Sequence, residues 1–502
     1  MVRMPSPHWD LLVRRMADLR ALQGALSVLL WDQETYMPRR GAESRGEQVA
    51  ALQAAVHRGL TAPDLGEALD AASSAAGLGG EELALLRVLR VERERAVRVP
   101  ERLVRELAEL QSAALPAWRA AREAGDFPAF APFLRRVVAL KREQASCYGV
   151  PEGGEPYDAL LDGYEEGMRV ARLEPLFRRI AGWLSPLVAR IAERPPPPDP
   201  FAGVRFDAGR QWDFTMEVLR AVGFDLEAGR QDRSAHPFTL AADPGDVRLT
   251  TRILEGQPIS AVMSTIHEAG HGLYEQGLPP SHRRDFLGQA PSMGLHESQS
   301  RLWENLVGRS RPFWRHFLPR LQALFPELAQ VGLDAFYRAV NRVERSPVRV
   351  EADELTYNLH IVLRFELERA LVGGSLEAAD VAAAWNDGMQ RLVGVRPAGD
   401  RDGVLQDIHW AQGDIGYFPT YAIGNLYAAS LFAAARRALP GLEDGFARGD
   451  FRPLLDWLGE NVHRHGRIFL AEEVVRRATG GGLSDADFRA HLEAKYGDLY
   501  SP

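Results

Sequence analysis

The sequence predicts a mainly α-helical protein that contains one small β-hairpin. Apolar residues recur at helical spacing through most of the chain, and only residues 236–253 have a β-like composition. The chain has 502 residues, of which 46% are hydrophobic and 25% charged, so it has enough apolar material for a large core.

The first part of the chain, to about residue 193, has helical spacing throughout. Leu12, Met16 and Leu19 belong to one apolar face near its start, and similar patterns cover residues 81–99, 101–115 and 132–144. The prolines at 195–198 cannot continue a helix. We therefore expect residues 195–200 to connect a helical part, about 1–193, to a metal-site part, about 200–502, within a single catalytic unit of residues 1–502.

The β-like segment has the composition of a hairpin. Residues 236–240 and 247–253 are rich in strand-forming side chains, and Asp-Pro-Gly-Asp at 243–246 between them is a strong turn signal. We therefore expect a small β-hairpin or sheet near residues 236–253.

The segment that follows contains a metal-binding pattern, His-Glu-Ala-Gly-His at 267–271. Pro258 suits the first turn of a helix and Gly277 its C-terminal end. Residues four apart share one face of a helix, so His267 and His271 can bind one metal ion together. Glu268 follows the first ligand and can reach a metal-bound water as the general base.

Two glycines, Gly270 and Gly272, lie beside these histidines and weaken the predicted helix by about 1 kcal/mol each relative to alanine. They indicate that something packs closely there. Substrate backbone and a neighbouring helix explain them equally well.

A catalytic zinc site has three protein ligands and one open position. Glu297, in a second predicted helix, is the candidate for the third ligand. His296 competes with it, but adjacent residues point about 100° apart on a helix. We therefore predict a site of His267, His271 and Glu297, in which bound zinc lowers the pKa of water to about 7 and Glu268 takes the proton as a peptide carbonyl is attacked.

Charge and composition exclude several other classes. The net charge is −8 and no run of basic residues indicates nucleic acid as a partner. No apolar run approaches the roughly 18 residues of a membrane span, and no secretory signal is visible. With a single cysteine, Cys147, we expect a cytoplasmic protein. Among 60 basic residues only Lys141 and Lys495 are lysines, which we attribute to biased codon usage.

Several further motifs follow one another along the chain. They are His-Pro-Phe at 236–238, Asp-x-Arg-x-Thr at 246–250, the histidine motif, His-Glu-Ser-Gln at 296–299, Val-Arg-x-x-Ala-Asp at 348–353 and Gly-x-x-Gln-Asp-x-His-Trp at 403–410. In these motifs, and over essentially its whole length, the chain resembles the carboxypeptidase Taq family of metallocarboxypeptidases. Trp-Asp-Gln-Glu-Thr at 31–35 also resembles that family, and Val348 stands where the family often has isoleucine.

This resemblance implies a large helical, saddle-like or cleft-bearing fold, similar to neurolysin and angiotensin-converting enzyme. It implies release of C-terminal amino acids from peptides with broad specificity and poor action on proline. It also implies one Zn²⁺ or Co²⁺ per subunit and a homodimer.

A carboxypeptidase must bind a free carboxylate, which the planar fork of arginine recognises best. We favour Arg349 for this role and assign Arg248 to the closed end of the cleft, with His236 as a further substrate-binding residue. Simple ion pairs, Arg349 with Asp353 and Arg248 with Asp246, are the alternatives.

The tetrahedral intermediate needs donors beside the metal. We assign this role to His409 and to a tyrosine, Tyr421 first and Tyr417 second, although either ring could equally be a packed aromatic. Asp407 and Asp353 are candidate acceptors for the ligand imidazoles.

Two other functions remain open. An oligopeptidase or dipeptidyl-releasing enzyme on the same scaffold would share every metal residue. A non-catalytic helical binding protein is the other alternative, and the presence of Glu268 with all three ligands argues against it.

Overall fold

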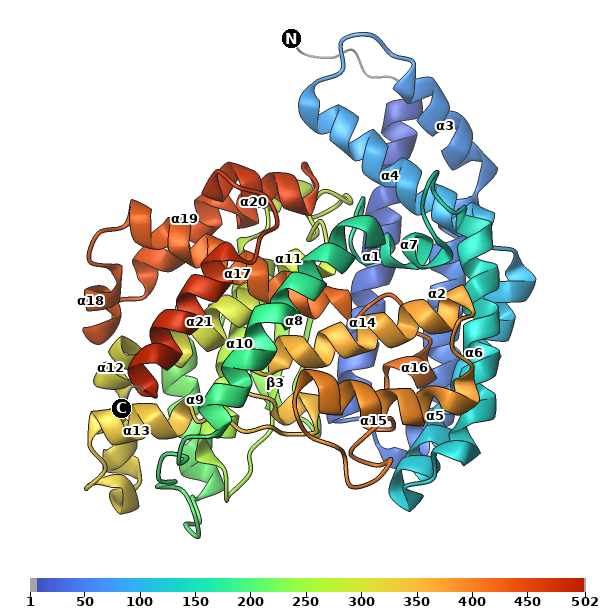
Figure 1. Ribbon diagram of the computed structural model, residues 1–502. Coiled ribbons are helices and arrows are strands. Elements are labelled where there is room, and N and C mark those ends of the chain that lie inside the picture. The colour runs from blue at the N-terminus through green and yellow to red at the C-terminus, as the bar shows by residue number, and fades with distance from the viewer. Residues whose placement is uncertain (1–6, 501–502) are drawn as a thin grey trace.

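The computed structural model describes residues 7–500, and these are mainly helical, with one three-stranded sheet (Figure 1). The helices are α1 (Pro7–Thr35), α2 (Ala42–Thr61), α3 (Pro63–Ser73), α4 (Gly80–Arg98), α5 (Glu101–Ala124), α6 (Phe127–Tyr148), α7 (Pro156–Leu161), α8 (Val170–Ala192), α9 (Ala208–Ala221), α10 (Pro258–Gly277), α11 (Met293–Arg301), α12 (Arg311–Leu324), α13 (Leu333–Val340), α14 (Tyr357–Gly373), α15 (Val381–Leu392), α16 (His409–Gln412), α17 (Pro419–Ala438), α18 (Leu442–Ala447), α19 (Arg452–Asn461), α20 (Ala471–Thr479) and α21 (Ala486–Leu499). A π-helix, η3 (Leu302–Gly308), continues α11, and short 3₁₀ turns are η1 (Arg39–Gly41), η2 (Pro280–His282), η4 (Pro326–Leu328), η5 (Arg349–Glu351), η6 (Ala378–Asp380) and η7 (His463–His465).

The helices predicted for the first part of the chain are confirmed, with ends set by local chemistry. α5 runs beyond the predicted residue 115 and stops where Gly125 adopts a left-handed conformation, with φ of 68°. The side chain of Asp126 then accepts a hydrogen bond from the backbone of Ala129 and begins α6. No helix lies between Ala192 and Ala208, where the proline tract was expected to connect two parts.

The sheet contains the predicted hairpin and one strand more. β2 (Thr239–Asp243) pairs antiparallel with β3 (Asp246–Thr251), while residues 236–238 lie outside the strand. β1 (Gly229–Arg233) pairs parallel with β3, which is therefore the central strand. β1 was not predicted, because its Gly-Arg-Gln-Asp-Arg sequence has no apolar alternation.

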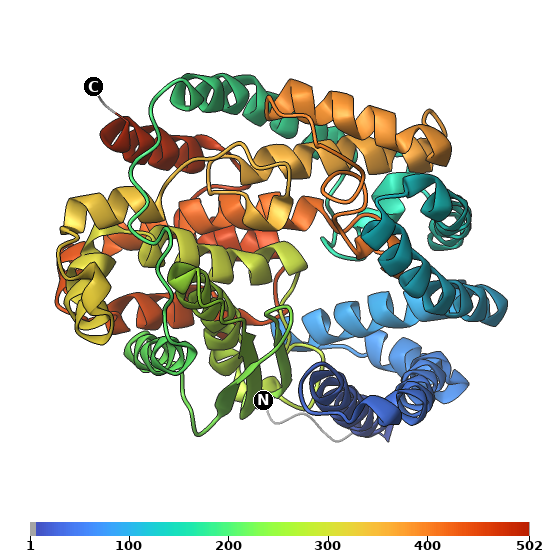
Figure 2. The same cartoon turned by 90° about the horizontal axis from the view of Figure 1, so that it is seen from below.

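The main hydrophobic core includes residues from Ala114 to Leu499, so it contains side chains from both sides of the proline tract. A second cluster joins α1, α3 and α4 to Phe286 and Leu287. Figure 2 shows the N-terminal helices grouped at one edge of the molecule beside the sheet, where α1 contacts β2. That residues 1–502 act as one catalytic unit stays a prediction.

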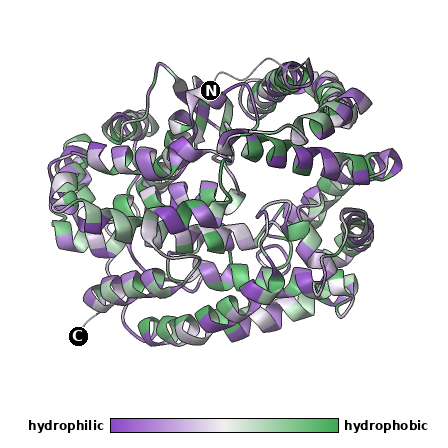
Figure 3. Ribbon diagram, turned by 90° about the horizontal axis from the view of Figure 1, so that it is seen from above, coloured by the Kyte–Doolittle hydropathy of each residue, from purple (hydrophilic) through white to green (hydrophobic). Residues whose placement is uncertain are grey.

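Most helices carry hydrophilic and hydrophobic residues in alternation along their length, as Figure 3 shows. This is the pattern of helices that bury one face. Within residues 7–500 none of the helices combines the length and the apolar character that crossing a membrane requires.

Candidate metal centre

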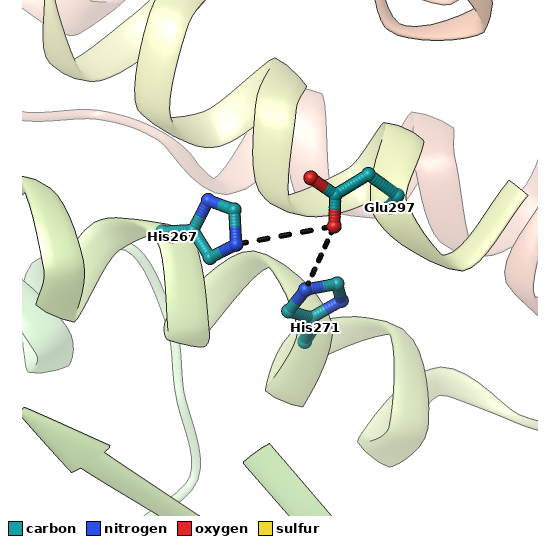
Figure 4. Close-up of side chains that lie close together, drawn as sticks. All are labelled: His267, His271 and Glu297. Atoms are coloured by element: carbon teal, nitrogen blue, oxygen red, sulfur yellow. Dashed lines mark ion pairs between the residues drawn. The ribbon is translucent and has the colours of Figure 1, made fainter. Parts of the chain in front are cut away.

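The two histidines of the motif lie on α10, which begins at Pro258 and ends at Gly277, the two residues predicted to bound it. Their side chains point toward Glu297 of α11 (Figure 4). Oε2 of Glu297 lies 3.9 Å from Nε2 of His267 and 3.4 Å from Nε2 of His271. Tetrahedral zinc with ligands at about 2.0–2.1 Å separates them by roughly 3.3 Å, so the three atoms have the spacing of a metal site.

Close packing between α10 and α11 explains the glycine beside the histidines. A Cβ on Gly270 would lie 2.5 Å from the carbonyl oxygen of Gln299, so only glycine lets the two helices approach this closely. A Cβ on Gly272 would meet Phe224 and Leu249 at 2.7 and 2.8 Å. Of the two explanations offered by the sequence, packing is the one that the structure confirms.

The second oxygen of Glu297 is held by Arg301, whose Nε donates to Oε1 over 2.6 Å. Burial alone would raise the pKa of Glu297, but Arg301 and the two imidazoles hold that pKa well below its usual range. Glu297 is therefore ionised, with Oε2 free to face His267 and His271.

The imidazole of His267 is oriented by a carboxylate that the sequence analysis missed. Nδ1 of His267 lies 2.9 Å from Oε2 of Glu304, in the π-helix η3, and Arg309 donates to the other oxygen of Glu304 over 3.0 Å. Glu304 follows Glu297 by seven residues, about two helical turns, and that spacing is the signal that could have found it.

The carboxylates predicted for this role, Asp407 and Asp353, were wrong. Asp407 binds the guanidinium groups of Arg349 and Arg364. Asp353 accepts hydrogen bonds from backbone groups, such as the N–H of Leu355. Both lie far from α10 in sequence, so only the folded chain decides which acid reaches an imidazole.

His296, the competing ligand, lies beside His271 but is not one of the side chains that converge on the metal position. Its Nε2 lies 2.8 Å from Oε1 of Glu275, and its ring stacks on His271 with centroids 4.5 Å apart. Because Glu275 occupies the nitrogen of His296, the group of side chains with metal-site spacing consists of His267, His271 and Glu297.

Glu268 is buried between α10 and the sheet. Its Oε2 accepts a hydrogen bond from the hydroxyl of Thr239 on β2 over 2.6 Å. Burial raises the pKa of Glu268 above its usual value. Burial also lowers the pKa of His271 to about 3, so this imidazole is neutral and has a lone pair for a cation.

Helix α17 brings Tyr421 toward the metal cluster. A Cβ on Gly424 would lie 2.6 Å from Cγ of Glu297, so α17 packs directly on that side chain. Tyr421 precedes Gly424 by three residues and lies on the same face of the helix. Its hydroxyl is 3.1 Å from Nε2 of His409, and the ring of Tyr417 lies 5.2 Å away. The three predicted donors therefore lie together, and the helix that carries Tyr421 and Gly424 packs on Glu297.

His409 is neutral in this environment. Burial, assisted by the positive charge of Arg349, lowers the pKa of His409 to about 3. A neutral imidazole can either donate to or accept from the hydroxyl of Tyr421.

Arg349 is buried and held by several partners. Its Nε and Nη2 donate to Oδ1 of Asp407 over 3.0 and 2.8 Å, and its Nη1 donates to the hydroxyl of Tyr357. The alternative pairing with Asp353 is wrong. Arg364 also donates to Asp407, over 2.7 Å, so two buried guanidinium groups share one carboxylate.

Arg248 and His236 lie at the sheet. Arg248 forms the ion pair with Asp246 that the sequence offered as an alternative, at 2.8 Å, and its guanidinium stacks 4.4 Å above the ring of Trp31. His236 is exposed, in the loop before β2. No hydrogen bond or ion pair joins either residue to the metal cluster within residues 7–500.

A family model described as carboxypeptidase Taq (M32) metallopeptidase matches residues 12–496. The chain belongs to this family. The resemblance seen in the sequence is thereby confirmed, and the protein is a metallocarboxypeptidase, an enzyme that hydrolyses peptide bonds. Membership also implies a divalent metal ion, for which the described residues offer the cluster on α10 and α11.

Relatives from other organisms agree with this membership of the M32 family. The chain is 46% identical to thermostable carboxypeptidase 1 of Thermus thermophilus, over 97% of each chain. It is 35% identical to carboxypeptidase 1 of Bacillus subtilis, over 95% of each chain.

Solved structures of M32 carboxypeptidases confirm the mainly helical fold. The crystal structure of the enzyme from Deinococcus radiodurans is 42% identical, with a TM-score of 0.96 over 99% of this chain and 100% of that one. The structure of the Pyrococcus furiosus carboxypeptidase, described as apo-Mg, is 36% identical, with a TM-score of 0.95 over 98% of this chain and 99% of that one.

Proposed function

We propose that this M32 carboxypeptidase releases C-terminal amino acids by metal-assisted hydrolysis, with the metal held by His267, His271 and Glu297. One observation carries the assignment: the Nε2 atoms of both histidines converge on a single oxygen of Glu297, at 3.9 and 3.4 Å. Nε2 of His267, whose Nδ1 faces Glu304, and the ionised Oε2 of Glu297 are both acceptors, and a cation between them and Nε2 of His271 would bind all three.

The donor set fits a borderline divalent cation. Two imidazole nitrogens and one carboxylate oxygen suit Zn²⁺ or Co²⁺, one per subunit. Such a metal, when bound, lowers the pKa of a coordinated water toward 7 and polarises the substrate carbonyl. Glu304 supports the set, because it fixes which nitrogen of His267 carries the proton.

Glu268 is the general base in this proposal. Glu268 follows the proposed ligand His267 directly. Its Oε2 accepts the hydrogen bond from Thr239, so its Oε1 has no interaction with Thr239. That oxygen can accept the proton of the attacking water and later pass it to the leaving amine.

Tyr421 and His409 are proposed to stabilise the oxyanion that develops on the substrate carbonyl. The hydroxyl of Tyr421 is a hydrogen-bond donor on the face of α17 that packs against Glu297, and His409 lies 3.1 Å behind it. Tyr417, in ring contact with Tyr421, is the second candidate.

Arg349 is proposed to bind the terminal carboxylate of the peptide. Two buried guanidinium groups, of Arg349 and Arg364, face the single carboxylate of Asp407, so the group carries a net positive charge that an anion would neutralise. Arg349 also stacks 4.9 Å from the ring of Tyr421, which connects it to the proposed oxyanion donors. Arg248 is assigned to the closed end of the substrate cleft, and His236 is proposed as a further substrate-binding residue.

Broad specificity with poor action on proline and a homodimeric state are proposed from the family resemblance. A cytoplasmic location is proposed from the single cysteine, Cys147. Light scattering at several concentrations tests the homodimer, and a set of peptides that differ only in the last residue tests the specificity.

Peptides with a blocked N-terminus and either a free or an amidated C-terminus test the reaction directly. We expect mass spectrometry to show a ladder of single-residue losses from the free acid alone, abolished by a chelator and restored by Zn²⁺ or Co²⁺. Losses of dipeptides, or equal cleavage of the amide, would instead favour the oligopeptidase or dipeptidyl-releasing alternative.

A further inference from the structure

A cavity away from the metal cluster lies between α5, α6 and the turn that follows α16. Its volume is about 270 Å³, enough for several water molecules or a small organic molecule. Figure 1 shows α16 beside α5 and α6 at one side of the molecule. Its lining includes Leu107, Gln111, Lys141, Gln144, Tyr164 and Asp414.

Lys141 is the unusual residue of this lining. The chain has only two lysines, and both are buried, 9% exposed for Lys141 and 8% for Lys495. Lys495 forms an ion pair with Glu354 over 2.6 Å. Lys141 has no hydrogen bond or ion pair with any of residues 7–500, and burial lowers its pKa to about 8. A buried ammonium without a direct partner is costly unless water or a ligand compensates it.

Two acidic residues act on Lys141 through space without contacting it. Glu368 is already used, because its carboxylate accepts hydrogen bonds from Tyr157, Trp410 and the backbone of Gly416. Asp414 lines the cavity itself. Burial raises its pKa, and a hydrogen bond with Tyr164 acts against that rise. Lys141 and Asp414 therefore line the same cavity from different elements.

Gln144 adds an unpaired acceptor to the same wall as Lys141. Its Nε2 donates to the hydroxyl of Tyr148 over 3.1 Å, while its Oε1 is buried without a hydrogen-bond partner. Gln144 follows Lys141 by three residues, so the two side chains are neighbours on one face of α6. The cavity thus offers a cationic donor, Lys141, and an acceptor, the carboxylate of Asp414, while the amide oxygen of Gln144 is buried in the wall and not open to the cavity.

We propose that this cavity binds a free α-amino acid with a small side chain. The carboxylate of the ligand would accept hydrogen bonds from Lys141, and its ammonium group would donate to Asp414. A simple anion would neutralise Lys141 but place a second negative charge near Asp414. A zwitterion instead places its carboxylate against Lys141 and its ammonium group against Asp414. Free α-amino acids are the products of a carboxypeptidase, so the ligand class is the one that the enzyme itself releases.

The cavity is connected to the proposed catalytic residues by the turn after α16. The backbone N–H of Asp414 donates to the carbonyl of His409 over 2.9 Å, and Gly416 is anchored by Glu368 over 3.0 Å. A ligand bound to Asp414 would therefore contact the turn between His409 and Tyr417. A released amino acid in this cavity would thereby act on the proposed oxyanion donors without entering the substrate site.

Calorimetric titration of the metal-loaded enzyme with glycine tests the proposal. We expect saturable binding to the wild type and at least tenfold weaker binding to Lys141→Met, which removes the charge and keeps the side-chain length. Arg135→Met, which removes an exposed charge from the same helix outside the cavity, should bind glycine normally. Equal affinity in Lys141→Met and the wild type would overturn the proposal.

Two further arms locate the site and identify the ligand. Glycine bound in the substrate site would be lost in Arg349→Ala and kept in Lys141→Met, which would overturn the proposal while leaving the role of Arg349 intact. Acetate should bind at least tenfold more weakly than glycine, and equal binding would refute the zwitterion. Asp414→Asn, which keeps the buried lysine and removes the negative charge from the other wall, should also weaken glycine binding at least tenfold. This second variant tests the same cavity if Lys141→Met does not fold, and unchanged affinity in it would likewise overturn the proposal.

Discussion

Nδ1 of His267 lies 2.9 Å from Oε2 of Glu304, on the side of the imidazole opposite Glu297. An ionised carboxylate can only accept, so the ring donates its Nδ1–H and keeps the Nε2 lone pair for a cation. Arg309 and Arg301 help to keep the pKa of Glu304 well below its usual range, against the effect of burial. The structure thus fixes the tautomer of one proposed ligand through a residue of the next helix.

Glu304→Gln should weaken metal binding about tenfold to a hundredfold, because it removes the charge that orients His267. Competition with a chelator of known affinity measures the change. Glu275→Gln is the matched control, since Glu275 bonds in the same way to His296, which is not a proposed ligand. If both variants lose metal affinity equally, the contact between Glu304 and His267 does not specifically support metal binding.

Glu268→Gln should keep its metal and lose activity by two to four orders of magnitude, because the proposed general base is gone. Metal content by mass spectrometry and kcat on a free-acid peptide give the two readouts. Turnover close to that of the wild type would exclude Glu268 as the base.

His271→Ala and Glu297→Ala should each lower metal content together with activity. His296→Ala should retain the metal, because the ring of His296 bonds to Glu275 instead of facing the cluster. Metal analysis after dialysis checks all three variants. The ligand assignment is refuted if His296→Ala empties the site and Glu297→Ala does not.

Thr239→Val should move the acid limb of the kcat/KM profile to higher pH. Burial raises the pKa of Glu268 and the hydrogen bond from Thr239 lowers it, so removing this hydroxyl raises the pKa further. A general base must be deprotonated, and activity is therefore lost as the pH falls through that pKa. Thr239→Ser keeps the hydroxyl and should leave the profile in place. An unchanged acid limb in Thr239→Val would contradict the assignment.

Arg349→Ala should reduce kcat/KM on free-acid peptides tenfold to a hundredfold, since a hydrogen bond to a charged group contributes about 1.5–3 kcal/mol. Amidating the peptide should harm the wild type strongly and this variant little further. Comparing both substrates in both enzymes gives the coupling energy. If the acid-to-amide ratio is the same in both, Arg349 is not the carboxylate receptor, and Arg248 is the next residue to test.

Local patterns in the sequence determined where helix α10 and the hairpin lie and which site residues share one helix face. Proline at 258, glycine at 277 and the apolar stripe between them set the bounds of α10, and the Asp-Pro-Gly-Asp turn set the hairpin. The spacing of His267 and His271 placed both rings on one face, because helical geometry depends only on nearby residues. Family motifs added the carboxypeptidase assignment, which the family match confirmed.

The tertiary structure alone decided which partners those residues have. Glu304 rather than Asp407 reaches His267, Asp407 rather than Asp353 pairs with Arg349, and β1 joins a sheet that its own sequence does not predict. Hydrogen bonds and ion pairs act over about 3–4 Å, and that distance depends on how distant helices pack and not on residue spacing. The glycines at 270 and 424 set that packing, because the absence of a side chain brings α11 against both α10 and α17.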